Sequence, residues 1–296
     1  MILFKVDNVA MSGRWNGLRK WHGLFLFAIL IACLIVPGLD VRLNVVRYAV
    51  DAGLPNAVRL ALVTDLHSCA YGEGQRELID AIDAEAPDAI LLCGDIYDDD
   101  APDDNTNAFI LGVCERYPVY YVTGNHEYRR GTPRFKEAMA FVKEHVTRLN
   151  DSAAQLTVGA AAVTIAGVND PAAYTTKEIK LDGALVTYEE KLAHVAKVTE
   201  GSAFTVLLAH RPEHIDLYRK YGFDLILSGH THGGQWRIPG LVNGLFAPNQ
   251  GLFPAYAGGL YAFDDATLIV SRGLARETTR LPRFYNRPEL VIVDLK

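Results

Sequence analysis

Two histidines, His230 and His232, stand one residue apart, directly after an apolar run at 225–227 and the pair Ser228-Gly229. Imidazole side chains bind metal ions and move protons near neutral pH. The arrangement recurs along the chain, because four other apolar runs also end in side chains that can bind metals. The five run ends together supply Asp65, His67, Asp95, Asn125, His126, His210, His230 and His232.

The types of these side chains indicate the chemistry of a metal site. Carboxylate, imidazole and amide oxygen are typical ligands of Mn, Fe, Zn and similar ions, whereas structural zinc sites are usually rich in cysteine. There are more such side chains than one tetrahedral ion needs. Two ions that share one carboxylate are the simplest interpretation. We therefore predict two divalent or transition metal ions as cofactors.

Glycines and residue spacing favour convergence of these ligands. Gly94, Gly124 and Gly229 each stand directly before the first ligand of a loop. Glycine allows a sharp turn and a close approach to a site, because it has no Cβ. In an extended backbone, alternate side chains point the same way. The D-x-H at 65–67 and the H-x-H at 230–232 would then each send two ligands into one cavity.

The apolar runs predict strands that alternate with helices. Helical spacing of apolar residues predicts helices over 74–86, 105–117, 132–145 and 187–199. Apolar runs predict strands over 43–50, 58–64, 88–93, 119–123, 204–210, 223–230, 266–271 and 289–295, with an antiparallel hairpin over 155–168. A strand–helix–strand unit within 58–93 makes the sheet partly parallel. Ligand sites of such sheets lie at the carboxyl ends of the strands, so we expect the metal ligands to meet there.

The composition excludes some classes of protein. Half of the 296 residues are hydrophobic, which provides for a substantial core. The net charge is −6, and residues 1–50 carry +4, so the remainder carries −10. An acidic body argues against nucleic acid as a partner. The cysteines form no C-x-x-C pair and are interpreted as buried or free thiols: Cys33, Cys69, Cys93 and Cys114.

The N-terminal region predicts a membrane anchor. Residues 21–39 form an uncharged, mostly apolar run of 19 residues, which is just long enough for a spanning helix. Basic residues before this run place residues 1–20 in the cytoplasm and the domain at 43–296 outside a single-pass cell membrane anchor. The alternatives are a lipoprotein modified at Cys33, a cleaved signal peptide and a buried helix.

Five motifs follow one another in a fixed order along the chain: D-L-H at 65–67, G-D at 94–95, G-N-H-E at 124–127, His210, and G-H-T-H at 229–232. In this order they resemble the motifs of the calcineurin-like metallophosphoesterases. The resemblance covers nearly all of 58–296. It implies an α/β fold, a four-layer αββα sandwich of two mixed sheets, with the site at the strand ends between the sheets.

The resemblance also implies a role for each side chain of the site. Asp65, His67, Asp95 and His232 would hold the first metal ion. Asp95, Asn125, His210 and His230 would hold the second, with Asp95 bridging the two. His126 resembles the family's histidine outside the metal ligands, which protonates the leaving oxygen or stabilises its charge. Glu127 would orient that histidine.

The function that follows is a metal-dependent phosphoric ester hydrolase. It would cleave a phosphomonoester, phosphodiester or pyrophosphate bond with a hydroxide that bridges two ions. The tail at 233–261, "SRGLARETTR" at 271–280 and "NRPEL" at 286–290 resemble a membrane-anchored bacterial branch. That branch includes UDP-2,3-diacylglucosamine hydrolases and cell-envelope phosphoesterases. The alternatives are a lipid-linked nucleotide pyrophosphatase and a non-catalytic, membrane-tethered metal-binding module.

Residues after the metal motifs bear on the substrate, which we expect to be a small phosphorylated or lipid-linked molecule. An aromatic lip over the site would accept an acyl chain or a nucleobase: Trp236, Phe246, Phe253, Tyr256 and Tyr261. Ordinary loop packing is the alternative for these residues. Arg237, Arg272 and Arg276 would recognise a second phosphate. The acidic run at 98–100, with Asp103 and Asp104, is interpreted as a solvated loop or as extra attraction for cations.

Overall fold

The computed structural model of the chain describes residues 12–175, 181–276 and 282–296. The chain divides into two compact units, Met1–Asp40 and Val41–Lys296. The smaller unit contains one long helix, α1 (Ser12–Gly38).

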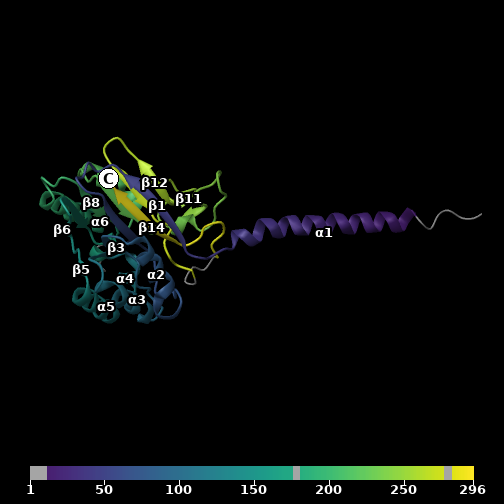
Figure 1. Ribbon diagram of the computed structural model, residues 1–296, viewed down its shortest axis with the longest axis horizontal. Coiled ribbons are helices and arrows are strands. Elements are labelled where there is room, and N and C mark those ends of the chain that lie inside the picture. Colours follow the sequence, from purple (N-terminus) through teal and green to yellow (C-terminus); the bar gives the residue numbers. More distant parts are fainter. Residues whose placement is uncertain (1–11, 176–180, 277–281) are drawn as a thin grey trace, which may run out of the picture. The chain divides into compact units, whose positions relative to one another are not determined.

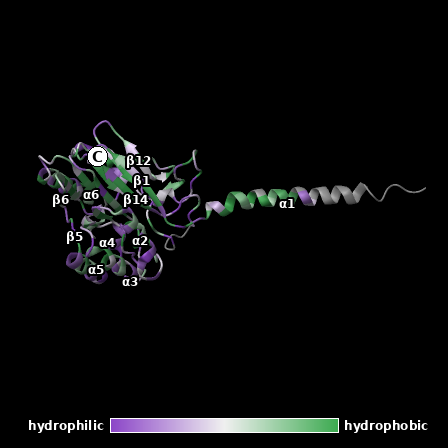
Figure 2. Ribbon diagram, viewed as in Figure 1, coloured by the Kyte–Doolittle hydropathy of each residue, from purple (hydrophilic) through white to green (hydrophobic). Residues whose placement is uncertain are grey.

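Helix α1 contains the run predicted as a membrane anchor. Its described side chains are mostly apolar and exposed, among them Phe25, Leu26 and Ile35 (Figure 2). Within the described residues, however, no helix combines the length and apolarity that a membrane crossing requires. The predicted membrane span over 21–39 is therefore not confirmed. Its 19 residues are only just enough to cross a bilayer as a helix. The side chains of the predicted basic segment, 1–20, lie outside the described residues.

The first sheet has six strands in the order β1-β14-β2-β3-β4-β5. Strands β2 to β5 run parallel, as the strand–helix–strand pattern predicts. The last strand of the chain, β14, lies between β1 and β2, parallel to β1 and antiparallel to β2, so the sheet is mixed. The strands are β1 (Asn44–Val50), β2 (Val58–Val63), β3 (Ala89–Cys93), β4 (Val119–Val122), β5 (Thr147–Arg148) and β14 (Glu289–Leu295).

The second sheet also has six strands, in the order β12-β13-β9-β8-β7-β6. Its four central strands are parallel, and both edge strands are antiparallel to their neighbours. The predicted hairpin over 155–168 is the pair β6 and β7. The strands are β6 (Ser152–Val158), β7 (Ala161–Gly167), β8 (Thr205–Leu208), β9 (Leu225–Ser228), β12 (Gly259–Ala262) and β13 (Thr267–Val270).

The layers follow from the alternation of apolar side chains along each strand. On β3, Ile90 packs with α2, α3 and α5, whereas Leu91 packs against the second sheet. On β9, Leu227 packs between the two sheets, whereas Ile226 packs with α6 and α7. The predicted αββα order of layers is thereby confirmed (Figure 1). These helices are α2 (Arg76–Glu85), α3 (Asp104–Cys114), α5 (Thr132–His145), α6 (Leu181–Val198) and α7 (Ile215–Lys220).

Several short elements escaped the sequence patterns. Helix α4 (Asn125–Arg129) begins inside the G-N-H-E motif, so Asn125 is its first residue. A small antiparallel pair, β10 (Phe246–Ala247) and β11 (Gly251–Leu252), lies in the tail that follows the last metal motif. Elements of two to five residues contain too few repeats of the apolar pattern for periodicity to reveal them.

Candidate metal centre

The metal-binding side chains lie on loops that leave the carboxyl ends of strands from both sheets. Backbone bonds connect these loops: Asp65 N–H donates to Gly94 O over 3.0 Å, and Gly229 N–H donates to His210 O over 3.0 Å. One link between the sheets is a bond from His230 N–H to the carboxylate of Asp65, at 3.0 and 3.1 Å to its two oxygens. The site is therefore built between the sheets, where the sequence predicts it.

One group of ligand atoms comes from Asp65, His67 and His232. These atoms all lie within 4.8 Å of one another. Nε2 of His232 is 3.5 Å from Oδ1 of Asp65, and the rings of His67 and His232 have centroids 5.0 Å apart. A cation between these three side chains would have one carboxylate and two imidazole ligands.

A second group comes from Asp95, His210 and His230, whose ligand atoms also lie within 4.8 Å of one another. Nε2 of His210 is 3.0 Å from Oδ2 of Asp95. The amide of Asn125 adjoins this group, and its nitrogen is 2.9 Å from Nδ1 of His230 in the orientation that satisfies both side chains.

Asp95 lies between the two groups. Its Oδ2 is 3.0 Å from Nε2 of His210 and 3.8 Å from Nε2 of His67, which belongs to the first group. Its Oδ1 accepts the backbone N–H of His126 over 2.8 Å. A single carboxylate thus faces both sets of ligands, as expected of a residue that bridges two ions.

The polar atoms at the centre fit divalent cations. Among the described residues, His67 Nε2 and His232 Nδ1 are buried without a hydrogen-bond partner, and His210 Nε2 faces the carboxylate of Asp95 at 3.0 Å. The opposite nitrogens of two of these rings are held, because Nδ1 of His67 lies 3.0 Å from Asp98 and Nδ1 of His210 lies 2.9 Å from the Cys93 carbonyl. A buried polar atom without a partner costs about 1–3 kcal/mol. Bound cations would remove that cost.

Burial and neighbouring charges shift the pKa values of the histidines in the site. Burial, with the neighbouring charges of His210 and Arg211, lowers the pKa of His230 to about 3. Burial also lowers the pKa of His232 well below its ordinary value. At His210 burial acts in the same direction, but the carboxylates of Asp95 and Asp65 outweigh it and raise the pKa to about 10. The carboxylates thus favour positive charge at His67 and His210, whereas burial favours the neutral form of His230 and His232, the form that binds metals.

The backbone of the ligands differs from the prediction. Left-handed φ values occur at Asp65 (49°), His67 (49°), Asp95 (52°), His230 (68°) and His232 (48°). The D-x-H and H-x-H pairs are thus not extended, and tight turns, not strand alternation, aim their side chains. Such a conformation costs about 1–3 kcal/mol at each non-glycine residue and is typical of functional sites.

The predicted need for glycine is visible at two positions. Gly94 has φ +82°, and a Cβ there would lie 2.5 Å from Nδ1 of His210. A Cβ on Gly124 would overlap the carboxylate of Asp95. Any larger residue at either position would displace a ligand of the second group.

Glu127 occupies a different place from the one predicted. Its buried carboxylate accepts the backbone N–H groups of Asp95, Ile96, Tyr97 and Gly124 over 2.8–3.2 Å, and the hydroxyl of Tyr121 over 2.8 Å. The described hydrogen bonds of this carboxylate therefore go to the loops and not to the ring of His126. Glu127 fixes the loops that carry Asp95 and Asn125.

The ring of His126 is instead oriented by the acidic run. Nδ1 of His126 lies 2.9 Å from Oδ1 of Asp99, and Nε2 lies 3.2 Å from Arg129. Asp98 is buried, and its Oδ1 also accepts the backbone N–H groups of Asp100 and Ala101. The interpretation of 98–100 as a solvated loop thus holds for exposed Asp100 but not for the other two. Their position in the loop that carries Asp95 was a signal that could have identified them.

Asn249 is another residue of the site that sequence reasoning missed. Its Oδ1 lies 3.0 Å from Nε2 of His230 and accepts from Nη1 of Arg211 over 3.2 Å. Arg211 is held by Asp170 at 2.6 and 3.0 Å. This chain of contacts leaves Nδ1 of His230 directed at Asn125. The sequence around Asn249 does not indicate a role in the site, because the residues that Asn249 contacts are distant in sequence.

The predicted aromatic lip is divided between two environments. Tyr256 and Tyr261 pack against the outer core of the second sheet, with ring centroids 5.2 Å apart. Trp236, Phe246 and Phe253 are exposed.

The three arginines proposed for a second phosphate all have contacts within the protein. Arg272 donates to Glu289 over 2.8 Å, and Arg276 pairs with Glu77 and lies over the ring of Tyr71. Arg237 donates to the carbonyl of Asn243 over 3.0 Å. Residues 277–280 of the motif "SRGLARETTR" lie outside the described residues.

Comparisons with known proteins agree with this geometry. The model of the family described as calcineurin-like phosphoesterase matches residues 58–234. An uncharacterized metallophosphoesterase of Campylobacter jejuni is 31% identical over 258 residues, which cover 84% of this chain and 62% of that protein. The phosphodiesterase YaeI of Escherichia coli is 28% identical over 255 residues, covering 84% of this chain and 81% of that protein.

In some relatives the matched region is only part of a longer protein. A transmembrane protein with a metallophosphoesterase domain from Bos taurus is 27% identical, and the match covers 74% of this chain but 49% of that protein. Among solved structures, a dimetal phosphatase from Danio rerio is 13% identical, with a TM-score of 0.47, over 73% of this chain and 88% of that one. The chain spans about 60% of the length of the Campylobacter relative.

Proposed function

Because the chain belongs to the calcineurin-like phosphoesterase family, we propose that it hydrolyses a phosphodiester with the help of two divalent cations. The observation that carries the proposal is the shared carboxylate: Asp95 faces the ligand atoms of both groups at 3.0 and 3.8 Å. The preference for a diester has support from the Escherichia coli relative, whose name is phosphodiesterase.

In this proposal the two groups of ligands each hold one cation. Asp65, His67 and His232 serve the first, while His210, His230 and Asn125 serve the second, and Asp95 serves both. When bound, two divalent cations lower the pKa of water toward neutrality and neutralise charge on the phosphate. The protein excludes bulk water from these ligands, since nearly all of them are buried, which strengthens the electrostatic interactions in the site.

His126 supplies the proton in the same proposal. Its ring is partly exposed, and its Nδ1 is held by Asp99. With Nδ1 donating to Asp99, Nε2 of the neutral ring accepts from Arg129, and it is the doubly protonated ring that delivers a proton from Nε2 to the oxygen of the leaving group. Arg129, 3.2 Å from this nitrogen, lies where it would meet the negative charge of the substrate.

Turnover of a chromogenic diester tests the proposal. We expect the full chain, purified with Mn²⁺, to release nitrophenolate from bis-p-nitrophenyl phosphate, and chelation of the metal to stop the release. An excess of Mn²⁺ should then restore the rate. The proposal fails if the protein binds two equivalents of metal and hydrolyses no monoester, diester or pyrophosphate, which is the behaviour of a metal-binding module without catalysis.

The location of the protein is a separate part of the proposal. We propose that apolar residues of 21–39 hold the protein at a cell membrane, with the metal centre outside the cytoplasm. The exposed apolar side chains of α1 and the name of the Bos taurus relative support this. Alkaline carbonate extraction tests the attachment, because a peripheral protein would be released. A reporter fused after Lys296 tests the side of the membrane.

A lipid-linked nucleotide is the alternative substrate, which the narrower resemblance at 233–261 favours. Incubation with UDP-2,3-diacylglucosamine separates the alternatives. Release of UMP would assign the protein as a pyrophosphatase, whereas hydrolysis of simple diesters alone would retain the first proposal.

A further inference from the structure

An apolar pocket of about 400 Å³ lies in the tail that follows the metal ligands. Its volume is within the range of about 300–1,000 Å³ typical of small-molecule sites. The apolar lining comes from both ends of the tail and from the segment before β14: Trp236, Ile238, Val242, Leu245, Phe253 and Phe284. The pocket is open to solvent, since Trp236 is 43% exposed, Ile238 53% and Phe253 66%. Contiguous exposed apolar surface is a feature of ligand-binding grooves.

The backbone around this pocket is bonded to the metal centre. Trp236 follows His232 by four residues, so the two lie within about 14 Å of each other. Asn286 donates to the carbonyls of His232 and Gln235 over 2.7 and 3.1 Å. The backbone N–H of Phe284 also donates to Gln235 O, over 3.1 Å. A short stretch of bonded backbone thus joins the lining of the pocket to the metal ligand His232.

The hydrogen bonds of the lining residues indicate which kind of ligand the pocket favours. The backbone N–H groups of Trp236, Ile238, Leu245 and Phe284 all donate to carbonyls within the protein, as do those of the other lining residues, Arg237, Val242 and Phe253. The indole N–H of Trp236 donates to the Pro282 carbonyl over 2.9 Å. A nucleobase or sugar would lose its hydrogen bonds to water and gain few here, which is costly. A hydrocarbon chain needs none.

The first residues of the larger unit are bonded to the segment that follows the pocket residue Phe284. Arg287, three residues after Phe284, donates to the carbonyls of Arg42 and Leu43, each over 2.9 Å. Arg287 thereby fixes the segment between Phe284 and β14.

We infer that this pocket binds the hydrocarbon chain of the substrate, a phosphate ester that carries an alkyl or acyl tail. This inference deepens the proposed function and rests on it for the reaction at phosphorus. Water adds to phosphorus, the bond from phosphorus to the leaving oxygen breaks, and that oxygen takes a proton. The chain in the pocket takes no part in these steps and contributes binding free energy alone.

Two p-nitrophenyl phosphodiesters test the inference, one with a methyl group and one with a decyl group as the second ester. Both are assayed below the concentration at which the decyl ester aggregates. Each buried methylene is worth about fourfold, so we expect kcat/KM of the full chain to be at least about tenfold higher for the decyl ester. Ile238→Glu, at an exposed lining position, should bring that ratio close to one.

Leu241→Glu is the matched control, because Leu241 is 80% exposed in the same turn and does not line the pocket. This variant should keep the preference for the decyl ester. Equal rates for both esters in the parent chain, or a preference that survives Ile238→Glu, would overturn the inference.

A binding measurement separates the pocket from the reaction. The chain has three tryptophans, Trp15, Trp21 and Trp236, so replacing the first two by phenylalanine leaves only the one in the pocket. Decyl phosphate brominated on its chain should quench this fluorescence, and Ile238→Glu should abolish the quenching. If neither ester is hydrolysed but quenching follows this pattern, the proposed function fails and the pocket stands. Absence of quenching in the parent chain rules the pocket out.

Discussion

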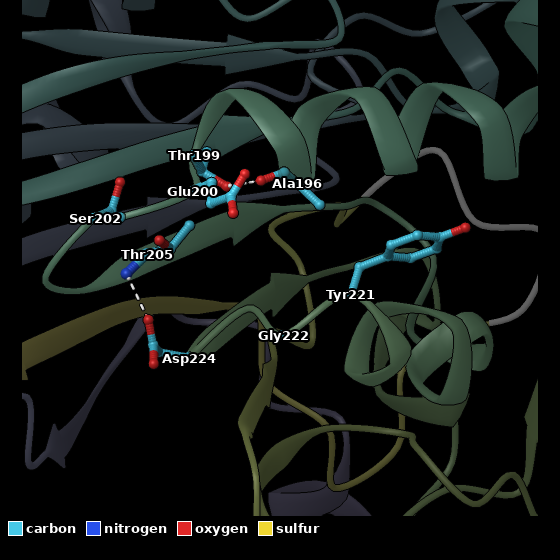
Figure 3. Close-up of a pocket in the computed structure, with 9 residues that line it drawn as sticks. Ala196, Thr199, Glu200, Ser202, Thr205, Tyr221, Gly222 and Asp224 are labelled. Carbon is cyan, nitrogen blue, oxygen red and sulfur yellow. Dashed lines mark hydrogen bonds between the residues drawn. The ribbon is translucent and has the colours of Figure 1, made fainter.

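The two ends of the parallel strands in the second sheet both carry polar side chains, but they use them differently. At the amino ends of β8 and β9, a cavity of about 310 Å³ is lined by polar residues of the α6–β8 and α7–β9 loops (Figure 3). There Asp224 accepts the backbone N–H of Thr205 over 2.7 Å. At the carboxyl ends, His210 and His230 are buried, and Nδ1 of His232 is buried without a hydrogen-bond partner among the described residues.

The difference shows that a polar hollow does not by itself identify a site. The amino edge resembles an ordinary strand start, in which side chains satisfy backbone groups beside solvent. The carboxyl edge keeps buried ligand atoms unpaired and holds their backbone in left-handed conformations. A fold retains such costs where a ligand offsets them. Variants at the two edges should therefore affect different properties of the protein.

Asp95→Asn should have the largest effect, because it weakens both cation positions at once. Loss of a general acid typically lowers the rate by about 10²–10⁴-fold, and we expect a larger loss of activity here. Mass spectrometry should find fewer metal ions per chain than in the parent, for which about two are expected. Asp224→Asn, at the amino edge, is the control and should retain both ions. Full metal occupancy in Asp95→Asn would contradict the bridging role.

His126→Ala should retain both ions and lower kcat by about 10²–10⁴-fold, because it removes the proton donor without removing a ligand. The loss should be smaller for a substrate whose leaving group needs no proton, such as a nitrophenyl ester, than for an alkyl ester. Parallel assays of these two esters measure that difference. Equal losses for both would assign His126 to charge stabilisation instead of proton transfer.

Asp98→Ala should weaken metal binding by about 10–100-fold, the usual effect of losing a carboxylate that orients a histidine ligand. The Mn²⁺ concentration for half-maximal activity measures this change, and excess Mn²⁺ should restore the rate. Asp100→Ala is the matched control, because Asp100 belongs to the same acidic run but is exposed. An unchanged metal requirement in Asp98→Ala would show that its contact with His67 does not position the ring.

Asp224→Ala should have the smallest effect on activity and a measurable one on folding. It removes one hydrogen bond at the amino edge, which contributes about 0.5–1.5 kcal/mol to the free energy of unfolding. Urea denaturation should show a lower midpoint at an unchanged slope. A large loss of activity in this variant would remove the contrast between the two edges.

Local sequence patterns predicted most of this site because its ligands follow buried strands. Runs such as 58–63 and 225–228 are apolar enough to be read as strands, and the residue types after them are specific to metal sites. The αββα layers followed from the family resemblance and are confirmed by the packing. The strand order of the first sheet was not predicted, because β14 joins β1 and β2 from the other end of the chain.

The roles of the acidic residues show where local patterns end. Asp98, Asp99 and Asp100 look alike in the sequence, but Asp98 contacts His67, Asp99 contacts His126 and Asp100 faces solvent. A difference of one residue in a tight turn changes the direction of each side chain, and that turn depends on the bonds that Glu127 makes from another loop.

By itself the sequence determined the chemistry of this protein: the ligand types, their order, and their location at the carboxyl edge of the sheets. Periodicity and burial are local properties, so they can be read along the chain. The resemblance implied that Asp95 bridges the two ligand groups. Only the tertiary structure decided that Glu127 holds loops instead of His126, and that the tail and Phe284 together form an apolar pocket. These features depend on contacts such as the one between Asp65 and His230, 165 residues apart, which form only when the two sheets pack together.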